Sequence, residues 1–107
     1  MSVREREVEA YLRKRVEALG GECVKFHPDD KPGYPDRIVM LPGGILVWVE
    51  LKKPKGGKLS SLQKFRHEEL RQLGQHVVVV WTKVDADWLV GWMEARMRES
   101  LHTGSPA

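Results

Sequence analysis

The fold is decided by the stretch Gly33-Tyr-Pro-Asp-Arg-Ile-Val-Met-Leu-Pro-Gly-Gly-Ile-Leu-Val-Trp-Val-Glu-Leu-Lys52. The triplet Pro42-Gly43-Gly44 is a turn signal between two apolar runs rich in β-branched side chains, so the stretch predicts a β-hairpin. If Leu41 and Ile45 close a three-residue loop, the numbers of paired residues sum to 86. This register opposes the following pairs: Asp36 with Glu50, Ile38 with Trp48, and Met40 with Leu46.

Two carboxylates therefore face each other across the predicted hairpin. Opposed residues on one face of a sheet have Cβ atoms roughly 4.5–5.5 Å apart, and like charges there destabilise the sheet. A divalent cation between Asp36 and Glu50 would remove that repulsion, and Lys52 shares the face of Glu50 because strand side chains alternate. The plainer alternatives are that Asp36 caps a turn and that Glu50 and Lys52 are an ordinary surface pair.

Hydrophobic spacing outside the hairpin predicts three helices and two further strands. The order of elements is α-β-β-β-α-β-α, and a strand-helix-strand sequence implies a parallel pair with a right-handed crossover. We therefore predict an α/β sandwich with a mixed four-stranded sheet. The helices are expected over 3–19, 59–73 and from Asp85 to about Arg98, and the strands over 22–27 and 76–81.

The first helix carries an acid in line with its apolar stripe. Glu5 lies three residues before Val8 and shares its face, whereas Glu7 and Glu9 point elsewhere. The alternative is a first-turn acid that is favoured only by the helix dipole. The core-facing stripe of this helix consists of Val8, Leu12, Val16 and Leu19.

The second helix begins at a Ser-x-x-Gln capping box made by Ser60 and Gln63. Gln63 therefore has a structural role that is sufficient to explain it. The predicted apolar side of this helix consists of Leu62, Phe65, Leu70 and Leu73.

The chain is long enough for one domain, and its charge is unevenly placed. It has 107 residues, 41% hydrophobic and 31% charged residues, and a net charge of +3. Between Lys52 and Arg66 there is no acid, and the excess of positive charge suits a polyanionic ligand. The alternative is a solvated loop and helix face. The six basic residues there are Lys52, Lys53, Lys55, Lys58, Lys64 and Arg66.

Several classes of protein are disfavoured by composition. Cys23 is the only cysteine, so an intramolecular disulfide and a cysteine-based zinc cluster are excluded. The four histidines show no ligand spacing. The start of the chain lacks the apolar stretch of a signal peptide, and no run approaches the roughly 18 apolar residues of a membrane span. We therefore expect a soluble, intracellular protein with a frayed tail over 100–107.

The hairpin acids suggest metal-assisted phosphodiester chemistry. Carboxylates are hard oxygen ligands that suit Mg²⁺ or Mn²⁺. A cation between Asp36 and Glu50 could bind a scissile phosphate and lower the pKa of a bound water. Lys52 could orient or help deprotonate that water, or offset developing negative charge. The basic loop over 53–58 would hold flanking phosphates without reading sequence.

The same residues resemble a known nuclease superfamily. Pro35-Asp36, thirteen residues, and Glu50-Leu51-Lys52 resemble the PD-(D/E)xK phosphodiesterase motif. The flanking pattern is similar to the VRR-NUC (virus-type replication-repair nuclease) family, from about Arg4 to Trp81. It is carried by Arg4-Glu-Arg-Glu-Val-Glu-Ala-Tyr-Leu12, Gly33–Gly44, Val49-Glu-Leu-Lys52 and Leu59-Ser-Ser-Leu-Gln63.

The resemblance implies a restriction-endonuclease-like core, a single nuclease domain over 1–99 and a cofactor of Mg²⁺ or Mn²⁺. The implied catalytic residues are Asp36, Glu50, Lys52, Glu5 and Gln63, with Glu7 as a competitor of Glu5. The implied metal ligands are Asp36, Glu50, Glu5 and Leu51, with Glu5 acting directly or through water. The expected DNA contacts are Lys53, Lys55, Lys58, Lys64 and Arg37.

The expected function is structure-selective cleavage of branched DNA, with four-way (Holliday) junctions resolved by a homodimer in the cytoplasm of a bacterium or a phage-infected cell. Trp88 and Trp92, with Trp81 nearby, are candidates for the dimer surface or for plain core. We expect no membrane partner and no small-molecule cofactor. The alternatives are a flap or nicking nuclease, a restriction-like enzyme, and a DNA-binding module that does not cut.

Overall fold

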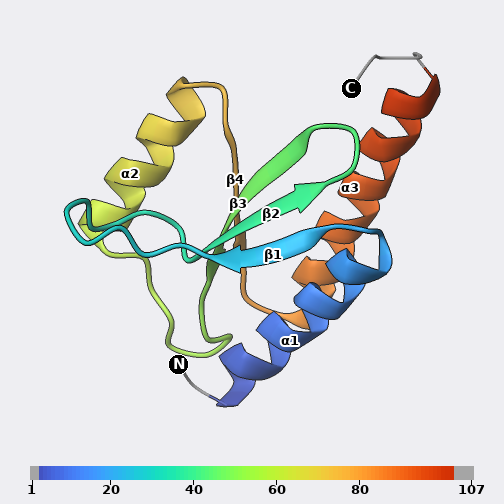
Figure 1. Ribbon diagram of the computed structural model, residues 1–107. Helices are drawn as coiled ribbons and strands as arrows, with labels where there is room; N and C mark the ends of the chain where they lie inside the picture. Colours follow the sequence, from blue (N-terminus) through green and yellow to red (C-terminus); the bar gives the residue numbers. More distant parts are fainter. Residues whose placement is uncertain (1–2, 103–107) are drawn as a thin grey trace.

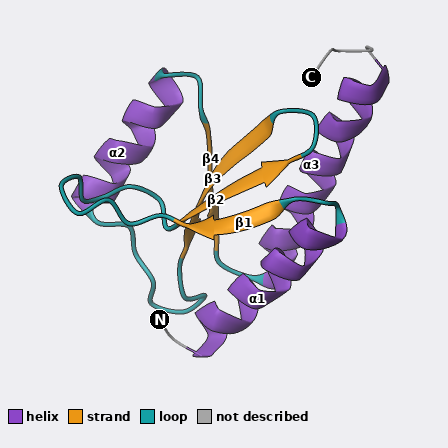
Figure 2. Ribbon diagram, viewed as in Figure 1, coloured by secondary structure: helices purple, strands orange, loops and turns teal. Residues whose placement is uncertain are grey.

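The protein is a four-stranded sheet with helices on both faces (Figure 1). The computed structural model describes residues 3–102, and the order of elements is the predicted one. The helix α2 covers one face of the sheet, and α1 and α3 lie together on the other (Figure 2). The elements are α1 (Val3–Ala18), β1 (Glu22–Lys25), β2 (Arg37–Leu41), β3 (Ile45–Leu51), α2 (Ser61–Gln72), β4 (His76–Val80) and α3 (Lys83–His102).

The sheet has the predicted mixed topology and register. Strands β1, β2 and β3 pair antiparallel, and β3 pairs parallel with β4, in the spatial order β1-β2-β3-β4. Ile38 lies opposite Trp48 and Met40 opposite Leu46, as the three-residue loop requires. The loop needs glycine because Gly43 and Gly44 have φ of +93° and +76°, a left-handed conformation that other residues rarely adopt.

The main core lies between the α1/α3 layer and one face of the sheet. Alternate residues of the hairpin point into it, and their side chains are aliphatic and buried. The stripe of α1 packs there as predicted, with Val8, Leu12 and Val16 buried. The sheet and α3 contribute Val39, Leu41, Val47, Val49, Leu51, Val80, Ala86, Leu89, Val90 and Met93.

The predicted inward side of α2 was wrong. Phe65 is 58% exposed, Leu73 is 73% exposed, and Leu62 is also exposed. Only Leu70 of the predicted set is buried, together with His67. The residues that a helix packs against a sheet all lie on one helical face. In α2, this face does not contain most of the apolar residues.

The stripe of α2 that faces the sheet is largely polar. Its members follow helical spacing, and its Arg66 donates a hydrogen bond from Nε to the carbonyl oxygen of Pro32 at 3.2 Å. The guanidinium also lies over the ring of Tyr34, 5.6 Å from its centroid. Arg66 therefore holds the loop that precedes β2 against α2. The stripe consists of Gln63, Arg66, His67 and Leu70.

An aromatic cluster holds the same loop against the sheet. The ring centroid of Phe26 lies 5.7 Å from that of Tyr34 and 5.3 Å from that of Trp48. The indole N–H of Trp48 donates to Gln75 Oε1 at 2.9 Å. Aromatic pairs at these separations contribute roughly 0.5–1.5 kcal/mol beyond burial. The cluster fixes the chain immediately before Asp36.

The last helix is longer than predicted at both ends. Thr82 caps its start, because Thr82 Oγ1 accepts from Asp85 N at 3.2 Å and Asp85 Oδ2 accepts from Thr82 N at 3.1 Å. The helix runs to His102 and so includes residues 100–102 of the predicted tail. The rest of that predicted tail, 103–107, lies outside the described residues. No described helix is both long and apolar enough to cross a bilayer.

Candidate active site

A pocket of about 340 Å³ lies at the end of β3 and brings together all five predicted catalytic residues. The first turn of α1 and the loop after β3 lie at the same end of the molecule (Figure 1). Residues from α1, α2, three strands and the loops beside them thus meet at one place. The lining consists of Glu5, Lys25, His27, Asp36, Arg37, Glu50, Leu51, Lys52 and Gln63.

Asp36 contacts Glu50 across the start of the hairpin. The Asp36 carboxyl is hydrogen-bonded to that of Glu50, and its Oδ2 accepts from the main-chain N–H of Leu51 at 3.0 Å. The Asp36 carbonyl accepts from Phe26 N at 2.9 Å, which continues the β1–β2 pairing. Asp36 therefore bridges two strands next to Glu50, as the hairpin register predicts, and does not cap a local turn.

Glu50 is a buried carboxyl, with 1% of its surface exposed. Burial raises its pKa to about 9, the contact with Asp36 adds to the rise, and Lys52 opposes it. A carboxyl with a pKa this high keeps its proton at neutral pH, because burial disfavours the charged form. Burial excludes the alternative of an ordinary surface pair between Glu50 and Lys52.

His67 is a site residue that the sequence analysis missed. Its Nε2 lies 3.2 Å from Glu50 Oε1, and both side chains are 1% exposed. Burial lowers the pKa of His67, so the pair is a hydrogen bond involving a neutral imidazole and not an ion pair. The available signal was helical spacing, because His67 lies four residues after Gln63 on the same stripe of α2.

Lys52 and Glu5 are two further charged residues of the pocket, besides Lys25 and Arg37. Lys52 extends the β3–β4 pairing by donating its main-chain N–H to Val80 O at 3.1 Å, which sets the direction of the chain at this point. Glu5 is half-buried and lines the pocket, whereas Glu7 is exposed. Glu5, and not Glu7, thus lies at the pocket, as the helical-face argument predicts, and its role as a metal ligand stays a prediction.

Gln63 has the predicted capping role and also lines the pocket. Its Oε1 accepts from Ser60 N at 2.9 Å, and its own N–H donates to Ser60 Oγ at 3.1 Å. The capping box places the first turn of α2 beside the acids.

The predicted DNA contacts divide into two groups. Lys53, Lys55, Lys58 and Lys64 are exposed near the pocket. Arg37 is only 3% exposed, and it donates from its NH1 group to Asp36 O at 3.0 Å, with Nε 3.8 Å from Glu9. Arg37 shares the face of Val39 and Leu41, which is buried under α1. Its assignment as a surface contact to DNA is therefore wrong.

The donor set fits a hard divalent cation. Two carboxyls in contact, a third carboxylate in the same pocket and the main chain of Leu51 offer oxygen donors only. Mg²⁺ is usually held by one or two carboxylates and keeps several waters. Within residues 3–102 no group of three or more His, Cys, Asp or Glu side chains is arranged to hold a metal ion. A cation here would be held by the carboxyl groups of Asp36 and Glu50 with water completing its shell, which is the mode that Mg²⁺ usually takes.

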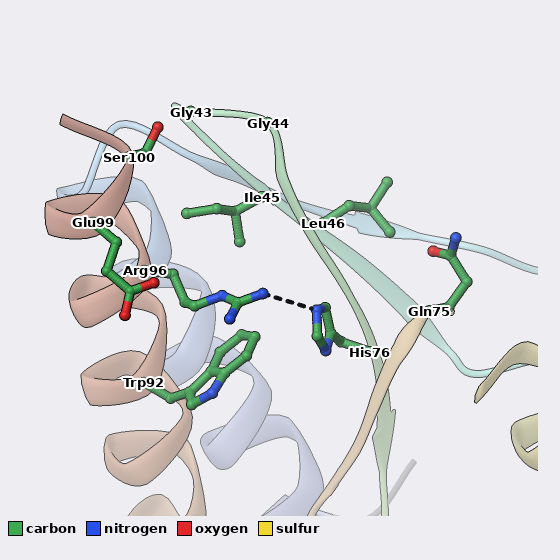
Figure 3. Close-up of a pocket in the computed structure, with 10 residues that line it drawn as sticks. All are labelled: Gly43, Gly44, Ile45, Leu46, Gln75, His76, Trp92, Arg96, Glu99 and Ser100. Carbon is green, nitrogen blue, oxygen red and sulfur yellow. Dashed lines mark hydrogen bonds between the residues drawn. The ribbon is translucent and has the colours of Figure 1, made fainter. Parts of the chain in front are cut away.

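A larger hollow of about 610 Å³ lies at the other end of the sheet, next to the hairpin turn and α3 (Figure 3). Arg96 contacts two rings there, with its guanidinium carbon 4.9 Å from the Trp92 centroid and its NH2 group 3.3 Å from His76 Nε2. Glu99 is the one acid in this lining. The hollow lacks the paired acids of the first pocket.

Comparisons of the sequence and the fold with known proteins identify similar nucleases and nuclease-domain structures. No protein-family model matches the chain. The protein named "Putative nuclease p44" from Acyrthosiphon pisum secondary endosymbiont phage 1 is 38% identical over 78 residues, which are 73% of this chain and 83% of that protein.

Solved structures extend the likeness to three dimensions. One described as "VRR_NUC domain" is 36% identical, with a TM-score of 0.79 over 84% of this chain and 97% of that one. Another, described as "VRR_NUC domain protein", is 20% identical, with a TM-score of 0.59 over 89% and 88% of the two chains, and it shows the fold alone. The sequence relative and the first structure together establish that this chain belongs to the VRR_NUC family.

Proposed function

We propose that this protein is a Mg²⁺- or Mn²⁺-dependent endonuclease that hydrolyses phosphodiester bonds in DNA. The observation that carries the proposal is the meeting of Asp36, Glu50 and Lys52 in one pocket beside an exposed basic segment. Two buried or half-buried acids in contact are unfavourable for a module that only binds a polyanion. They are useful where a cation must be held against a phosphate.

Five of the residues that line the pocket have a defined part in this reaction. When bound, the cation supplies Lewis-acid stabilisation of phosphate charge and a water of lowered pKa. Asp36 and Glu50 offer it oxygen ligands, and the main-chain N–H of Leu51 keeps Asp36 in place. Glu5 adds a ligand from α1, directly or through water. Lys52 orients the attacking water or offsets the negative charge that develops on the phosphate.

The exposed lysines near the pocket provide the contact with the DNA backbone. Such contacts depend on salt, because each neutralised phosphate releases condensed counterions. They carry no sequence information by themselves, so they suit an enzyme that selects DNA by shape. These lysines are Lys53, Lys55, Lys58 and Lys64.

The substrate we propose is branched DNA, above all the four-way junction, cut by a homodimer. A two-fold dimer presents two pockets related by the symmetry that a four-way junction also has. Val84 and Trp88 lie four residues apart on α3 and are 74% and 69% exposed. Exposed aromatic residues are enriched at protein interfaces. Trp92 is half-buried against the core, so Trp88 is the better candidate for the dimer surface.

The decisive experiment is cleavage of labelled four-way, flap and linear duplex DNA with Mg²⁺, with Mn²⁺ and with EDTA. Wild type, Lys52→Ala and Lys14→Ala are compared, because Lys14 is an exposed lysine outside the pocket lining. We expect paired symmetric nicks in the four-way junction that disappear with EDTA or Lys52→Ala and persist with Lys14→Ala.

The other outcomes separate the alternatives. Cutting of flaps or linear duplex instead of junctions would support the metal site but reject the four-way junction as the substrate. The protein would then be a flap, nicking or restriction-like enzyme. Salt-sensitive binding that ignores EDTA, with no cutting of any substrate, would leave a DNA-binding module and overturn the enzymatic proposal.

A further inference from the structure

His67 is a buried polar side chain that the proposed reaction does not use. We propose that it is a positioning residue, which holds one oxygen of Glu50 and leaves the other for the cation. The inference rests on the proposed function, and it concerns how the Glu50 ligand is oriented. It is carried by the contact between His67 Nε2 and Glu50 Oε1 at 3.2 Å.

Hydrogen bonding identifies the imidazole nitrogen that carries the hydrogen. Nδ1 of His67 is buried and has no hydrogen-bond partner among residues 3–102. A hydrogen on Nδ1 would be a buried donor without an acceptor, which is more costly than a bare lone pair. The hydrogen therefore belongs on Nε2, where it is donated to Glu50 Oε1.

This hydrogen bond determines which oxygen of Glu50 is available. The Glu50 carboxyl is held from α2 by His67 and from the start of β2 by Asp36. Because Oε1 accepts from the imidazole N–H, Oε2 is the Glu50 oxygen that this contact leaves free. Glu50 would therefore offer Oε2 to a cation.

The position of His67 is itself well determined. It lies one turn after the capping box of Ser60 and Gln63, and Leu70 is buried one turn later on the same stripe. Gly33 packs against α2 on the loop side, where an added Cβ would lie 2.8 Å from Leu62 Cγ. Because these contacts fix the position of α2, the His67 N–H orients Glu50 before any cation binds. Groups that orient a metal ligand typically affect metal affinity or activity by about 10–100-fold.

Four variants test the inference by direct measurement of Mn²⁺ affinity, with calorimetry on the metal-free protein. His67→Gln places an amide nitrogen near the position of Nε2, whereas His67→Asn stops one methylene short and His67→Leu has no donor. Leu70→Ala is the matched control, because it disturbs the same buried stripe of α2 without touching Glu50. Circular dichroism confirms that each variant is folded.

We expect Mn²⁺ affinity to fall about 10–100-fold in His67→Leu and His67→Asn, and to stay within a few-fold of wild type in His67→Gln and Leu70→Ala. The Mn²⁺ concentration for half-maximal cleavage should shift by the same factors. A merely structural role would lower stability in Leu70→Ala and the His67 variants alike, without this shift. If His67→Leu does not fold, the inference is tested by comparing the Mn²⁺ affinity of His67→Gln with that of His67→Asn.

Two results would overturn the inference. One is wild-type Mn²⁺ affinity in His67→Asn or His67→Leu, which would leave the nuclease proposal intact. The other is the absence of Mn²⁺ binding by the wild type, which would overturn both proposals. The expected affinity pattern in a protein that cuts no DNA would support His67 as a positioning residue and reject the nuclease function.

Discussion

The two faces of the sheet differ in what their side chains do. Toward α1 and α3, the hairpin presents aliphatic side chains, such as Val47 and Val49, that are completely buried. Toward α2, the same strands present Met40, which is 39% exposed, the half-buried Trp48 and the buried acid Glu50. The first face holds the protein together, and the second positions its charged groups.

The contrast shows how one strand serves both purposes. Because strand side chains alternate, β3 places Val49 and Leu51 in the core and Glu50 on the opposite face. A buried carboxyl is unfavourable, so its position depends on neighbours that are already held rigidly. The aliphatic face supplies that rigidity. A chemical function depends on the acids that the opposite face then holds in place.

The largest expected effect belongs to the α2 face. Asp36→Asn should reduce cleavage at least about 100-fold, because it removes a charged ligand from the pocket. The metal-free protein should be about as stable as wild type at neutral pH, because Glu50 is uncharged there and the Asn side-chain oxygen can still accept from Leu51 N. Single-turnover cleavage and urea unfolding measure the two quantities. Full activity, or an activity loss explained by unfolding, would contradict the assignment of the site to this face.

A large effect on stability is expected from the α1/α3 face. Leu12 is completely buried in α1, so Leu12→Ala should lower the free energy of unfolding by about 2–5 kcal/mol. Phe65→Ala, at a residue of α2 that is 58% exposed, should change it by no more than about 0.5 kcal/mol. Equal effects in chemical denaturation would mean that α2 packs through its apolar residues after all.

The pH dependence of stability should reveal the buried acid. The pKa of Glu50 is raised to about 9 in the folded protein, from 4.5, so the folded state binds the extra proton between these values. The contribution of Glu50 to the free energy of unfolding should therefore be greatest below about pH 4.5 and fall as pH rises toward 9, by up to about 1.4 kcal/mol per pH unit.

Glu50→Gln isolates this contribution, because the amide does not titrate in that range. The difference in unfolding free energy between wild type and Glu50→Gln, measured without metal, should favour the variant increasingly as pH rises. An unchanged difference from pH 5 to 9 would show that Glu50 ionises normally. Saturating Mn²⁺ should restore the stability of the wild type at high pH, through preferential binding to the folded state.

The smallest effect is expected on the outside of the α1/α3 layer. Arg15 pairs with Asp87 and with Glu94, which links α1 to α3, but its side chain is 39% exposed. Exposed ion pairs contribute about 0–1 kcal/mol, so Arg15→Ala should lower stability by no more than that, and less at high salt. A loss comparable to that of Leu12→Ala would show that charge, and not aliphatic burial, joins the two helices.

Most of the fold was predictable because its signals are local. The turn at Gly43 and Gly44 and the alternation along β2 and β3 determine the register, and the register places Asp36 beside Glu50. Helical spacing likewise predicted that Glu5, and not Glu7, shares the face of the apolar stripe of α1. The capping box at Ser60 and Gln63 correctly placed the start of α2. Each of these depends on residues close together in the chain.

The errors arose where a side chain depends on a distant partner. On α2, the apolar residues Phe65 and Leu73 suggested the wrong inward face, because the stripe that packs is polar and faces a loop and an acid. Arg37 looked like a contact to DNA, yet its place on the core side of β2 buries it. The residue type at Phe65, Leu73 or Arg37 does not by itself show whether the side chain is buried or exposed.

The sequence by itself determined the order of elements, the hairpin register and the three residues Asp36, Glu50 and Lys52 at one strand end. Periodicity and turn chemistry act over a few residues, so they leave a readable pattern. Only the tertiary structure decided that His67 contacts Glu50 and that Arg37 is withdrawn from the surface. The packing of α2 against the sheet depends on the orientation of a whole helix, which its own spacing of apolar residues did not specify.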